Sequence, residues 1–296
     1  MAKAKAKEKK RLFRKNKSYK VDFFVATHDG ERKHAIIKEF LRTATNGFTP
    51  ARALAGDDDE QFAISSLTAL GTGVFQGVFG RYRFGETPVQ GTAEGAEEDV
   101  KLKPGHGLVQ KNHFLFFSNR NLIVYQRNPS GSHYSRLQRY LNLATEEQIT
   151  LEPILTTDAY ERLIRGGDAR IIDVSFQQPK DPALYKDLWL KDAIKLMNDV
   201  GGINARVRIS VGRSSSRLTR IKNAVVDLAK GGIAKVARVK LEGEEEQIDL
   251  IADRIIETIT VKLYDNGRPD PEEIYATLQQ AEVDRSHDLR TFFGRG

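Results

Sequence analysis

The sequence predicts an α+β protein in which a mixed β-sheet is flanked by helices and the chain divides into two lobes. Two observations carry this prediction. Runs in which apolar and polar residues alternate recur along the chain, and runs with apolar residues at helical spacing stand between them. The alternation of strands and helices is clearer in the second half. We expect a basic disordered tail over residues 1–20, an N-terminal lobe over 21–147 and a C-terminal lobe over 148–296.

The N-terminal lobe combines strand-forming runs with two amphipathic helices. The expected strands are 19–26, 61–70, 77–89 and the two arms of a hairpin at 113–128. The expected helices are 31–44 and 132–144. In the second helix, Tyr134, Leu137 and Leu141 recur at helical spacing. Residues 91–107 are polar and contain several glycines, so we expect them to form a mobile excursion.

The C-terminal lobe alternates strands and helices over its length. The expected strands are 148–155, 169–176, 204–212, 233–243 and 257–264. The expected helical segments are 158–166, 182–202, 213–230, a turn at 248–256 and 270–289. Glycines 201 and 202 suit the left-handed conformation that closes a helix, and Pro271 stands near the start of the last helix, where its missing N–H is tolerated.

The composition excludes several classes of protein. The chain has 296 residues and no cysteine, which excludes a disulfide scaffold, a thiol nucleophile and cysteine-ligated metals. No apolar run approaches the roughly 18 residues of a membrane span. The basic N-terminus lacks the apolar centre of a secretory signal, so we expect a cytoplasmic, nucleoid-associated protein.

The charge is segregated along the chain. The formal net charge is +7, and residues 1–20 alone hold ten Lys/Arg and one Glu. Residues 201–240 hold another ten Lys/Arg against Asp227 alone, and residues 241–260 are acidic. Segregation of this kind produces an electrostatic field that attracts polyanions. Three roles stay open for the tail: a solubility arm, nucleic-acid contact, or contact with an anionic membrane surface. Its auxiliary cations are Lys9, Lys10, Arg11, Arg14, Lys15 and Lys17.

Two alternating strands predict a flat basic surface. Side chains two residues apart lie on the same face of a strand, so Arg206 and Arg208 share one face of the first strand, and Arg238 and Lys240 share one face of the second. If these strands are parallel neighbours joined by the helix at 213–230, that helix covers their apolar face and all four cations project from the other. A solvated surface, neutralised in part by the acidic residues that follow, is the alternative interpretation.

The start of the helix at 213–230 carries arginines where the helix dipole disfavours them. One of the three serines at 214–216 can cap the helix, and the free backbone N–H groups, hydroxyls and arginines then converge on a place that suits a phosphate. The complete predicted DNA-binding set is Arg206, Arg208, Arg213, Ser214, Ser215, Ser216, Arg217, Arg220, Lys235, Arg238 and Lys240.

Motifs for catalysis or cofactors are weak or missing. Residues 71–77, "GTGVFQG", have Gln76 where a dinucleotide-binding loop needs a third glycine, and no Walker loop is present. The six histidines lack metal-ligand spacing, and the acidic run at 56–60 is typical of a solvated loop. We expect no catalytic residue, no metal and no small-molecule cofactor. A metal-dependent nuclease assembled from scattered carboxylates stays open as an alternative.

Several segments resemble, in order, the RexA-like phage-exclusion proteins of abortive-infection systems. They are "QITLEPILTTDAYERLI", "ARIIDVSFQQP", "LKDAIKLMNDVGG" and "VARVKLEGEEE", within residues 113–265. The resemblance implies a homodimer that binds double-stranded DNA without sequence preference and acts with a membrane effector encoded beside it. The DNA-contacting Arg-x-Lys pair of that family corresponds to Arg238 and Lys240. Serines replace several charged residues of the family's basic helix, and the tail and the excursion at 91–107 are departures.

Together, these observations predict a DNA-binding protein of a phage-defence system that senses DNA or regulates a membrane effector. Lysines and arginines would displace counterions from phosphates, so affinity would fall steeply with salt. The alternatives are a metal-dependent nuclease, which would cleave DNA with magnesium, and a nucleoid-type or RNA-binding protein, which would need no neighbouring membrane gene.

Overall fold

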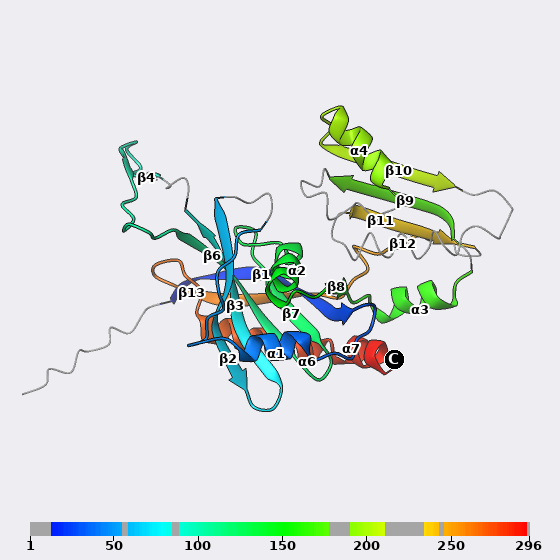
Figure 1. Ribbon diagram of the computed structural model, residues 1–296, viewed down its shortest axis with the longest axis horizontal. Coiled ribbons are helices and arrows are strands. Elements are labelled where there is room, and N and C mark those ends of the chain that lie inside the picture. The colour runs from blue at the N-terminus through cyan, green and yellow to red at the C-terminus, as the bar shows by residue number, and fades with distance from the viewer. Residues whose placement is uncertain are drawn as a thin grey trace, which may run out of the picture.

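The computed structural model describes residues 13–54, 59–84, 89–167, 169–177, 190–210, 234–242 and 246–294. Antiparallel sheets and helices combine in an α+β fold (Figure 1), so the predicted fold class is confirmed. The strands of the large sheet are β1 (Phe13–His28), β2 (Glu60–Leu70), β3 (Val74–Arg83), β6 (Leu108–Phe117), β7 (Leu122–Arg127), β8 (Ile149–Pro153) and β13 (Ile256–Tyr264). The remaining strands are β4 (Val89–Gly91), β5 (Glu97–Asp99), β9 (Ala169–Gln177), β10 (Asn204–Ser210), β11 (Ala234–Leu241) and β12 (Ile248–Asp249). The helices are α1 (Ile36–Arg42), α2 (Tyr134–Thr145), α3 (Thr157–Arg165), α4 (Lys191–Asp199), α6 (Pro271–Asp284) and α7 (Ser286–Phe293).

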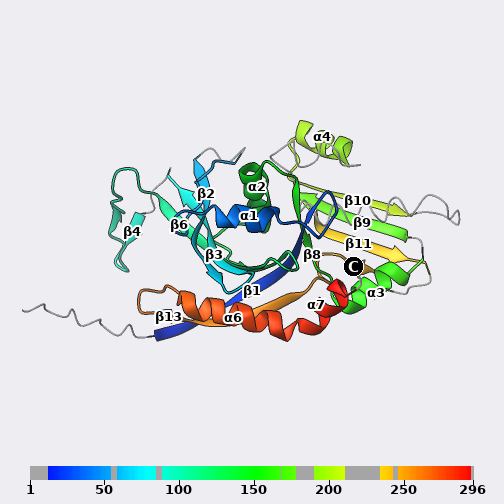
Figure 2. The ribbon, with the colours of Figure 1, turned by 60° about the horizontal axis from the view of Figure 1, so that its bottom comes forward.

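The large sheet has the strand order β13-β1-β7-β6-β3-β2, and β8 pairs with the far end of β1. It curves around α1 and α2, while α6 and α7 cover its other face (Figure 2). Every strand pair within the described residues is antiparallel, whereas we expected a mixed sheet.

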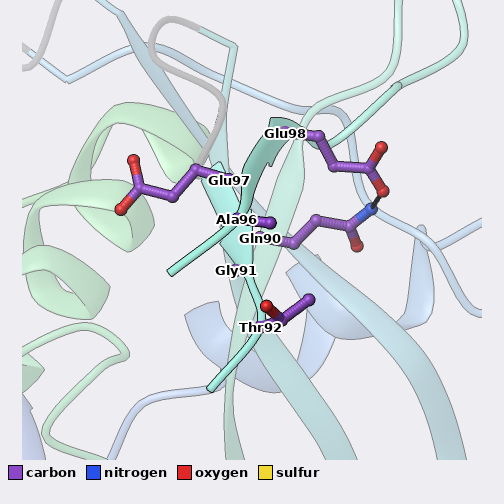
Figure 3. A pocket seen from close by; sticks show the side chains of 6 residues that line it. All are labelled: Gln90, Gly91, Thr92, Ala96, Glu97 and Glu98. Carbon is purple, nitrogen blue, oxygen red and sulfur yellow. Dashed lines mark hydrogen bonds between the residues drawn. The ribbon is translucent and has the colours of Figure 1, made fainter. Parts of the chain in front are cut away.

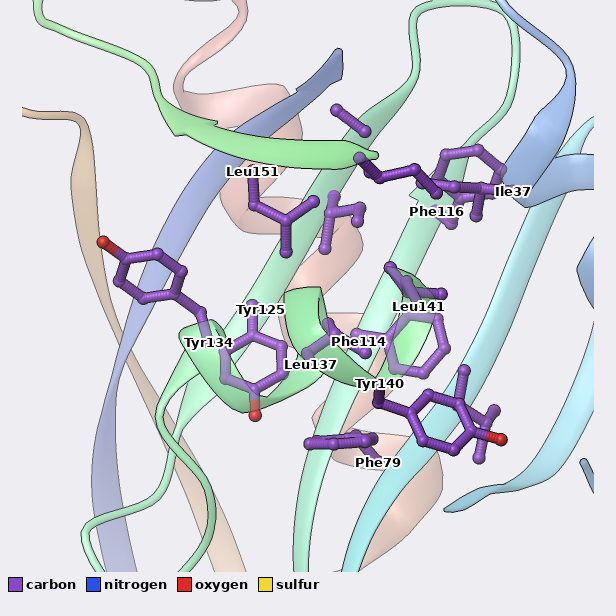
Figure 4. Packing of buried hydrophobic residues seen from close by; sticks show 14 of the residues in the cluster. Ile37, Phe79, Phe114, Phe116, Tyr125, Tyr134, Leu137, Tyr140, Leu141 and Leu151 are labelled. Atoms are coloured by element: carbon purple, nitrogen blue, oxygen red, sulfur yellow. The ribbon is translucent and has the colours of Figure 1, made fainter. Parts of the chain in front are cut away.

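Helix α2 fills the concave side of the large sheet with four buried side chains, Tyr134, Leu137, Tyr140 and Leu141. Figure 4 shows them packed among aromatic side chains of the sheet, including those of β3, β6 and β7. Tyr140 also donates a hydrogen bond to the carbonyl of Pro50 at 2.9 Å, so its polar end is satisfied. The helical spacing in this segment thus identified its buried face correctly.

Strand β1 is twice as long as expected and runs through the centre of the fold. It pairs with β13 from Phe13 to Asp22, with β7 from Lys20 to Val25 and with β8 from Phe24 to His28. The predicted tail over residues 1–20 is therefore wrong for residues 13–20, which form a strand. Tyr19 and Val21 are buried against α6 and α7, and this alternating burial continues the strand into the lysine-rich segment.

A second, four-stranded sheet has the order β10-β9-β11-β12 (Figure 1). Its apolar face packs against α3 and α4, with Ile172, Val174 and Phe176 of β9 at the centre. Strands β10 and β11 are each antiparallel to β9, which lies between them. The two basic strands are therefore parallel to each other, as expected, but they are not neighbours. Because β9 lies between them, the cations of the two basic strands are farther apart than they would be on neighbouring strands.

The segment that forms the second sheet is inserted in the chain between β8 and β13 of the large sheet, and we call the two crossing points at residues 154–155 and 253–255 the stem. The chain leaves the large sheet at Ile154, whose N–H donates to the carbonyl of Phe23 at 3.0 Å, and returns at Ile255, whose N–H donates to the carbonyl of Ile154 at 2.7 Å. After Ile255 the chain forms β13, α6 and α7, which belong to the large sheet. The segment expected to close the C-terminal lobe thus lies with the N-terminal one.

Several predicted boundaries need correction. The expected helical turn at 248–256 begins as the two-residue strand β12, and the expected helix at 270–289 is broken at Arg285 into α6 and α7. Arg285 donates to Glu257 and to the carbonyl of Ile256, at 2.8 and 3.0 Å, and so ties the break to β13. No helix in the described part of the chain is both long enough and apolar enough to cross a bilayer.

Candidate nucleic-acid interface

Charged side chains form a line across the strands of the small sheet. Asp173 lies in the middle of β9, directly opposite Arg208 of β10 on one side and Arg238 of β11 on the other. Asp249 of β12 lies opposite Arg238 in turn. Residues that pair directly in an antiparallel sheet point to the same face. Across the strands from β10 to β12, the charges therefore alternate: cation, carboxylate, cation, carboxylate.

Two more cations lie on this face, because side chains two residues apart on a strand point the same way. Arg206 stands two residues before Arg208, and Lys240 two residues after Arg238. We call Arg206, Arg208, Arg238 and Lys240 the basic face. Cations on one strand are about 6.6 Å apart along it, and the two strands are two interstrand spacings, about 9.6 Å, apart. The basic face thus consists of two rows with β9 between them.

Asp173 is clamped by Arg206. The Nε of Arg206 donates to one carboxylate oxygen at 2.7 Å, and a terminal nitrogen of the same guanidinium donates to the other oxygen. The Arg206 side chain is 62% exposed and the Asp173 side chain only 4%. These hydrogen bonds hold the pKa of Asp173 below its ordinary value against the opposing effect of burial, and the charges of Arg208 and Arg238 lower it further. Asp173 is a fixed negative charge beneath the guanidinium groups.

Arg238 is paired with Asp249 at the outer edge of the sheet. Its Nε donates to one carboxylate oxygen of Asp249 at 2.8 Å, and the Arg238 side chain stays 43% exposed. The other oxygen of Asp249 accepts the backbone N–H groups of Ile251 and Ala252, both at 3.0 Å. The turn after β12 therefore holds this carboxylate in place, and the carboxylate orients Arg238.

Arg208 and Lys240 are the available cations of the basic face. Within the described ranges, no carboxylate oxygen lies within 4.0 Å of either side chain. Arg208 is exposed and Lys240 is partly exposed. A phosphate that approaches this face can pair with these two groups without breaking an existing ion pair.

The predicted site residues divide into three groups. Arg206, Arg208, Arg238 and Lys240 are brought together on one face, as expected, though across an intervening strand. Lys235 lies where the pairing of β11 with β9 shifts register, and its side chain is outside the described residues. The helix-start residues also lie outside them: Arg213, Ser214, Ser215, Ser216, Arg217 and Arg220.

The tail cations belong to a different place from the basic face. Lys15 and Lys17 are exposed on β1, in the large sheet, and the ammonium group of Lys17 lies 4.9 Å from the ring centre of Tyr19. Arg14 lies on the same strand, but its side chain is not described. Lys9, Lys10 and Arg11 are outside the described residues. Contact of these cations with nucleic acid stays a prediction.

The expected excursion at 91–107 overlaps the hairpin of β4 and β5, which begins at Val89 and projects from the body of the protein (Figure 1). A shallow hollow on this hairpin is lined by Gln90, Gly91, Thr92, Ala96, Glu97 and Glu98 (Figure 3). Glu97 and Glu98 point to opposite sides, and Glu98 accepts a hydrogen bond from Gln90. Nothing here converges on a ligand. In the part of the chain that is described, no group of three or more His, Asp or Glu side chains is arranged to hold a metal.

Sequence reasoning missed the two carboxylates of the face. Asp173 is the single carboxylate in the largely apolar strand "ARIIDVSF", and a carboxylate between apolar residues of a strand signals a buried partner of opposite charge. Asp249 is one of several acidic residues in its stretch of sequence, so nothing there singles it out. Neither pairing was predictable, because both depend on which strands are neighbours.

Comparison with known proteins identifies a family but no activity. The model of a family described as being of unknown function (DUF6731) matches residues 71–287. The match contains all four cations of the basic face and both carboxylates, while β1 lies before it. No curated protein matches the chain.

Proposed function

The chain belongs to the DUF6731 family, and we propose that it binds the phosphate backbone of double-stranded DNA through the basic face without reading base sequence. The observation that carries this proposal is that Arg208 and Lys240, on opposite rows of one sheet face, have no carboxylate partner among the described residues. Cations that neutralise phosphates release condensed counterions, and this release supplies most of the affinity of non-specific binding.

The residues between the cations favour backbone contact over base contact. Ile171, Ser175 and Val236 lie on this face, and none of the described residues on it is aromatic. Base stacking on aromatic side chains supplies much of the affinity for single strands, and reading a sequence requires side chains that reach into a groove. A flat sheet with short side chains between two rows of cations offers neither.

The role in phage defence, the homodimer and the membrane effector are part of the same proposal and rest on the resemblance to the phage-exclusion proteins. Its DNA-contacting pair falls on Arg238 and Lys240, one row of the basic face. A nuclease and an RNA-binding protein are the rival functions, and the binding experiment separates them.

The test is binding of the full chain to a random 30-base-pair duplex over a series of salt concentrations. The variant is Arg208→Gln/Lys240→Gln, which removes the two cations that have no carboxylate partner among the described residues and leaves both ion pairs of the face intact. The matched control is Lys191→Gln/Lys195→Gln, the same change of charge at two exposed positions of α4, which packs against the apolar face of the same sheet. The slope of log affinity against log salt is negative, and each cation that no longer neutralises a phosphate should make it less negative by about 0.9. The slope should therefore become less negative by about 1.8 in the variant and stay unchanged in the control.

Three outcomes would overturn the proposal. An unchanged slope in the Arg208/Lys240 variant would reduce the basic face to solvated surface. Cleavage of the duplex when magnesium is added would indicate the nuclease, and preference for an RNA duplex in direct competition would indicate the RNA-binding protein.

A further inference from the structure

The basic face is divided by a carboxylate on its midline. Arg206 and Arg208 lie on β10, Arg238 and Lys240 lie on β11, and Asp173 occupies the strand between them. Asp249 carries the same charge, but it lies on β12 at the outer edge. The four cations and two carboxylates leave a surplus of positive charge that is concentrated in two rows and depleted between them.

This arrangement distinguishes ligands by the number of backbones that they present. A duplex presents two backbones separated by a groove about 6 or 12 Å wide, and the rows of the basic face, about 9.6 Å apart, fall within this range. A single strand presents one line of phosphates. It can follow one row and meet two cations, or it can run along the midline, where the side chains of both rows reach it.

Asp173 disfavours the midline path. Its carboxylate is 4% exposed, so water screens its field less than that of a surface carboxylate. It is fixed by two hydrogen bonds from Arg206 and cannot turn away from an approaching phosphate. Ile171 and Ser175, its neighbours on the same face of β9, offer neither a cation nor an aromatic ring in compensation.

We infer that Asp173 is a specificity-determining residue that makes the basic face select double-stranded over single-stranded nucleic acid. The inference rests on the proposed function, since it concerns the same face. Asp173 repels a phosphate placed between the rows, whereas Arg208 of one row and Lys240 of the other, which have no carboxylate partner among the described residues, remain for the two backbones of a duplex.

The experiment measures the affinities of the wild-type chain, Asp173→Asn and Asp249→Asn for a 30-base-pair duplex and for an unstructured 30-nucleotide single strand at one salt concentration. Asp173→Asn should raise single-strand affinity about fivefold more than duplex affinity, as expected for removal of one like charge several ångströms from a phosphate. Asp249→Asn is the matched control, because it removes an equal charge that also pairs with an arginine. It should raise both affinities by the same factor.

A second variant tests the inference in the opposite direction and keeps Asp173 itself in place. Ser175→Asp adds a carboxylate to the midline on the same face of β9. It should lower single-strand affinity more than duplex affinity. Thermal unfolding of each variant verifies that it is folded.

The results separate this inference from the proposed function. If Asp173→Asn and Asp249→Asn change the ratio of duplex to single-strand affinity equally, or if Ser175→Asp leaves it unchanged, the role of Asp173 is overturned while salt-dependent duplex binding stands. If the wild-type chain binds no duplex, the proposed function itself fails.

Discussion

Arg206 and Asp173 form a two-point ion pair across neighbouring strands in which the cation is exposed and the anion is buried. This asymmetry separates the structural from the functional charges of the basic face. Arg206 forms a direct ion pair with a buried carboxylate, whereas Arg208, two residues along the strand, forms none with a described carboxylate and acts on Asp173 only through its charge. Equal substitutions at the two positions should therefore have different consequences.

We expect Arg206→Gln to lower the melting temperature and Arg208→Gln to leave it nearly unchanged, while Arg208→Gln reduces DNA affinity. The reason is that a buried carboxylate without its partner is costly, and removal of an exposed unpaired cation is not. Thermal unfolding and duplex binding of both variants provide the check. Equal melting temperatures would show that Arg206 does not compensate Asp173.

The acid dependence of the same pair has a definite sign. The pKa of Asp173 is held below its ordinary value of 3.8 in the folded protein, so its contribution to stability is present above that value and is lost as the pH falls through the folded pKa. In Arg206→Gln the folded pKa moves back towards the ordinary value. The difference in unfolding free energy between wild type and variant, measured in urea from pH 6 to pH 3, should therefore shrink as the pH falls.

Asp22 should be among the most sensitive positions in the large sheet. Its side chain is 5% exposed, and it faces Arg127 of β7 and Arg254 of the stem, whose Nε lies 3.7 Å from the nearer carboxylate oxygen. Asp22→Ala leaves two guanidinium groups without their shared anion, so we expect a decrease of about 3–5 kcal/mol in unfolding free energy. Asp284→Ala is a suitable control, because Asp284 lies on exposed α6 surface and accepts one hydrogen bond from Gln280. Urea denaturation of both variants is the measurement, and similar decreases would contradict the assignment.

Two truncations of the N-terminus distinguish the contribution of residues 1–12 to stability from that of the first half of β1. Removing residues 1–12 takes away six Lys/Arg but spares the strand that begins at Phe13, so the melting temperature should be preserved. Removing residues 1–20 deletes buried Tyr19 and most of the pairing between β1 and β13, so the protein should be strongly destabilised. Circular dichroism during heating distinguishes the two truncated proteins. Equal stability would mean that β13 does not depend on the first half of β1.

The sequence predicted local structure better than it predicted which strands are neighbours in a sheet. Alternation identified both basic strands and the face on which each carries its cations, because the period of two residues is a local property. Strand order is set by contacts between distant segments, and the sequences of β10 and β11 do not indicate that β9 lies between them. Likewise, the high density of lysine made residues 13–20 resemble a tail, although Tyr19 and Val21 already had the spacing of a strand with one buried face.

Burial of His113 predicts a second pH dependence, opposite in sign to that of a paired histidine. His113 lies on β6 with its ring 5.4 Å from that of Tyr275 on α6, and its Nδ1 is 2.8 Å from the side-chain oxygen of Gln126. Desolvation lowers its pKa from the ordinary value of 6.5, more than the hydrogen bond to Gln126 raises it. The unfolded chain therefore binds a proton more readily than the folded one, and unfolding free energy falls as the pH drops below about 6.5. In His113→Gln, which keeps a side chain able to hydrogen-bond, the slope between pH 7 and pH 5 should flatten. Urea denaturation across this range gives the slope for both proteins, and an unchanged slope would show that His113 is not the group responsible.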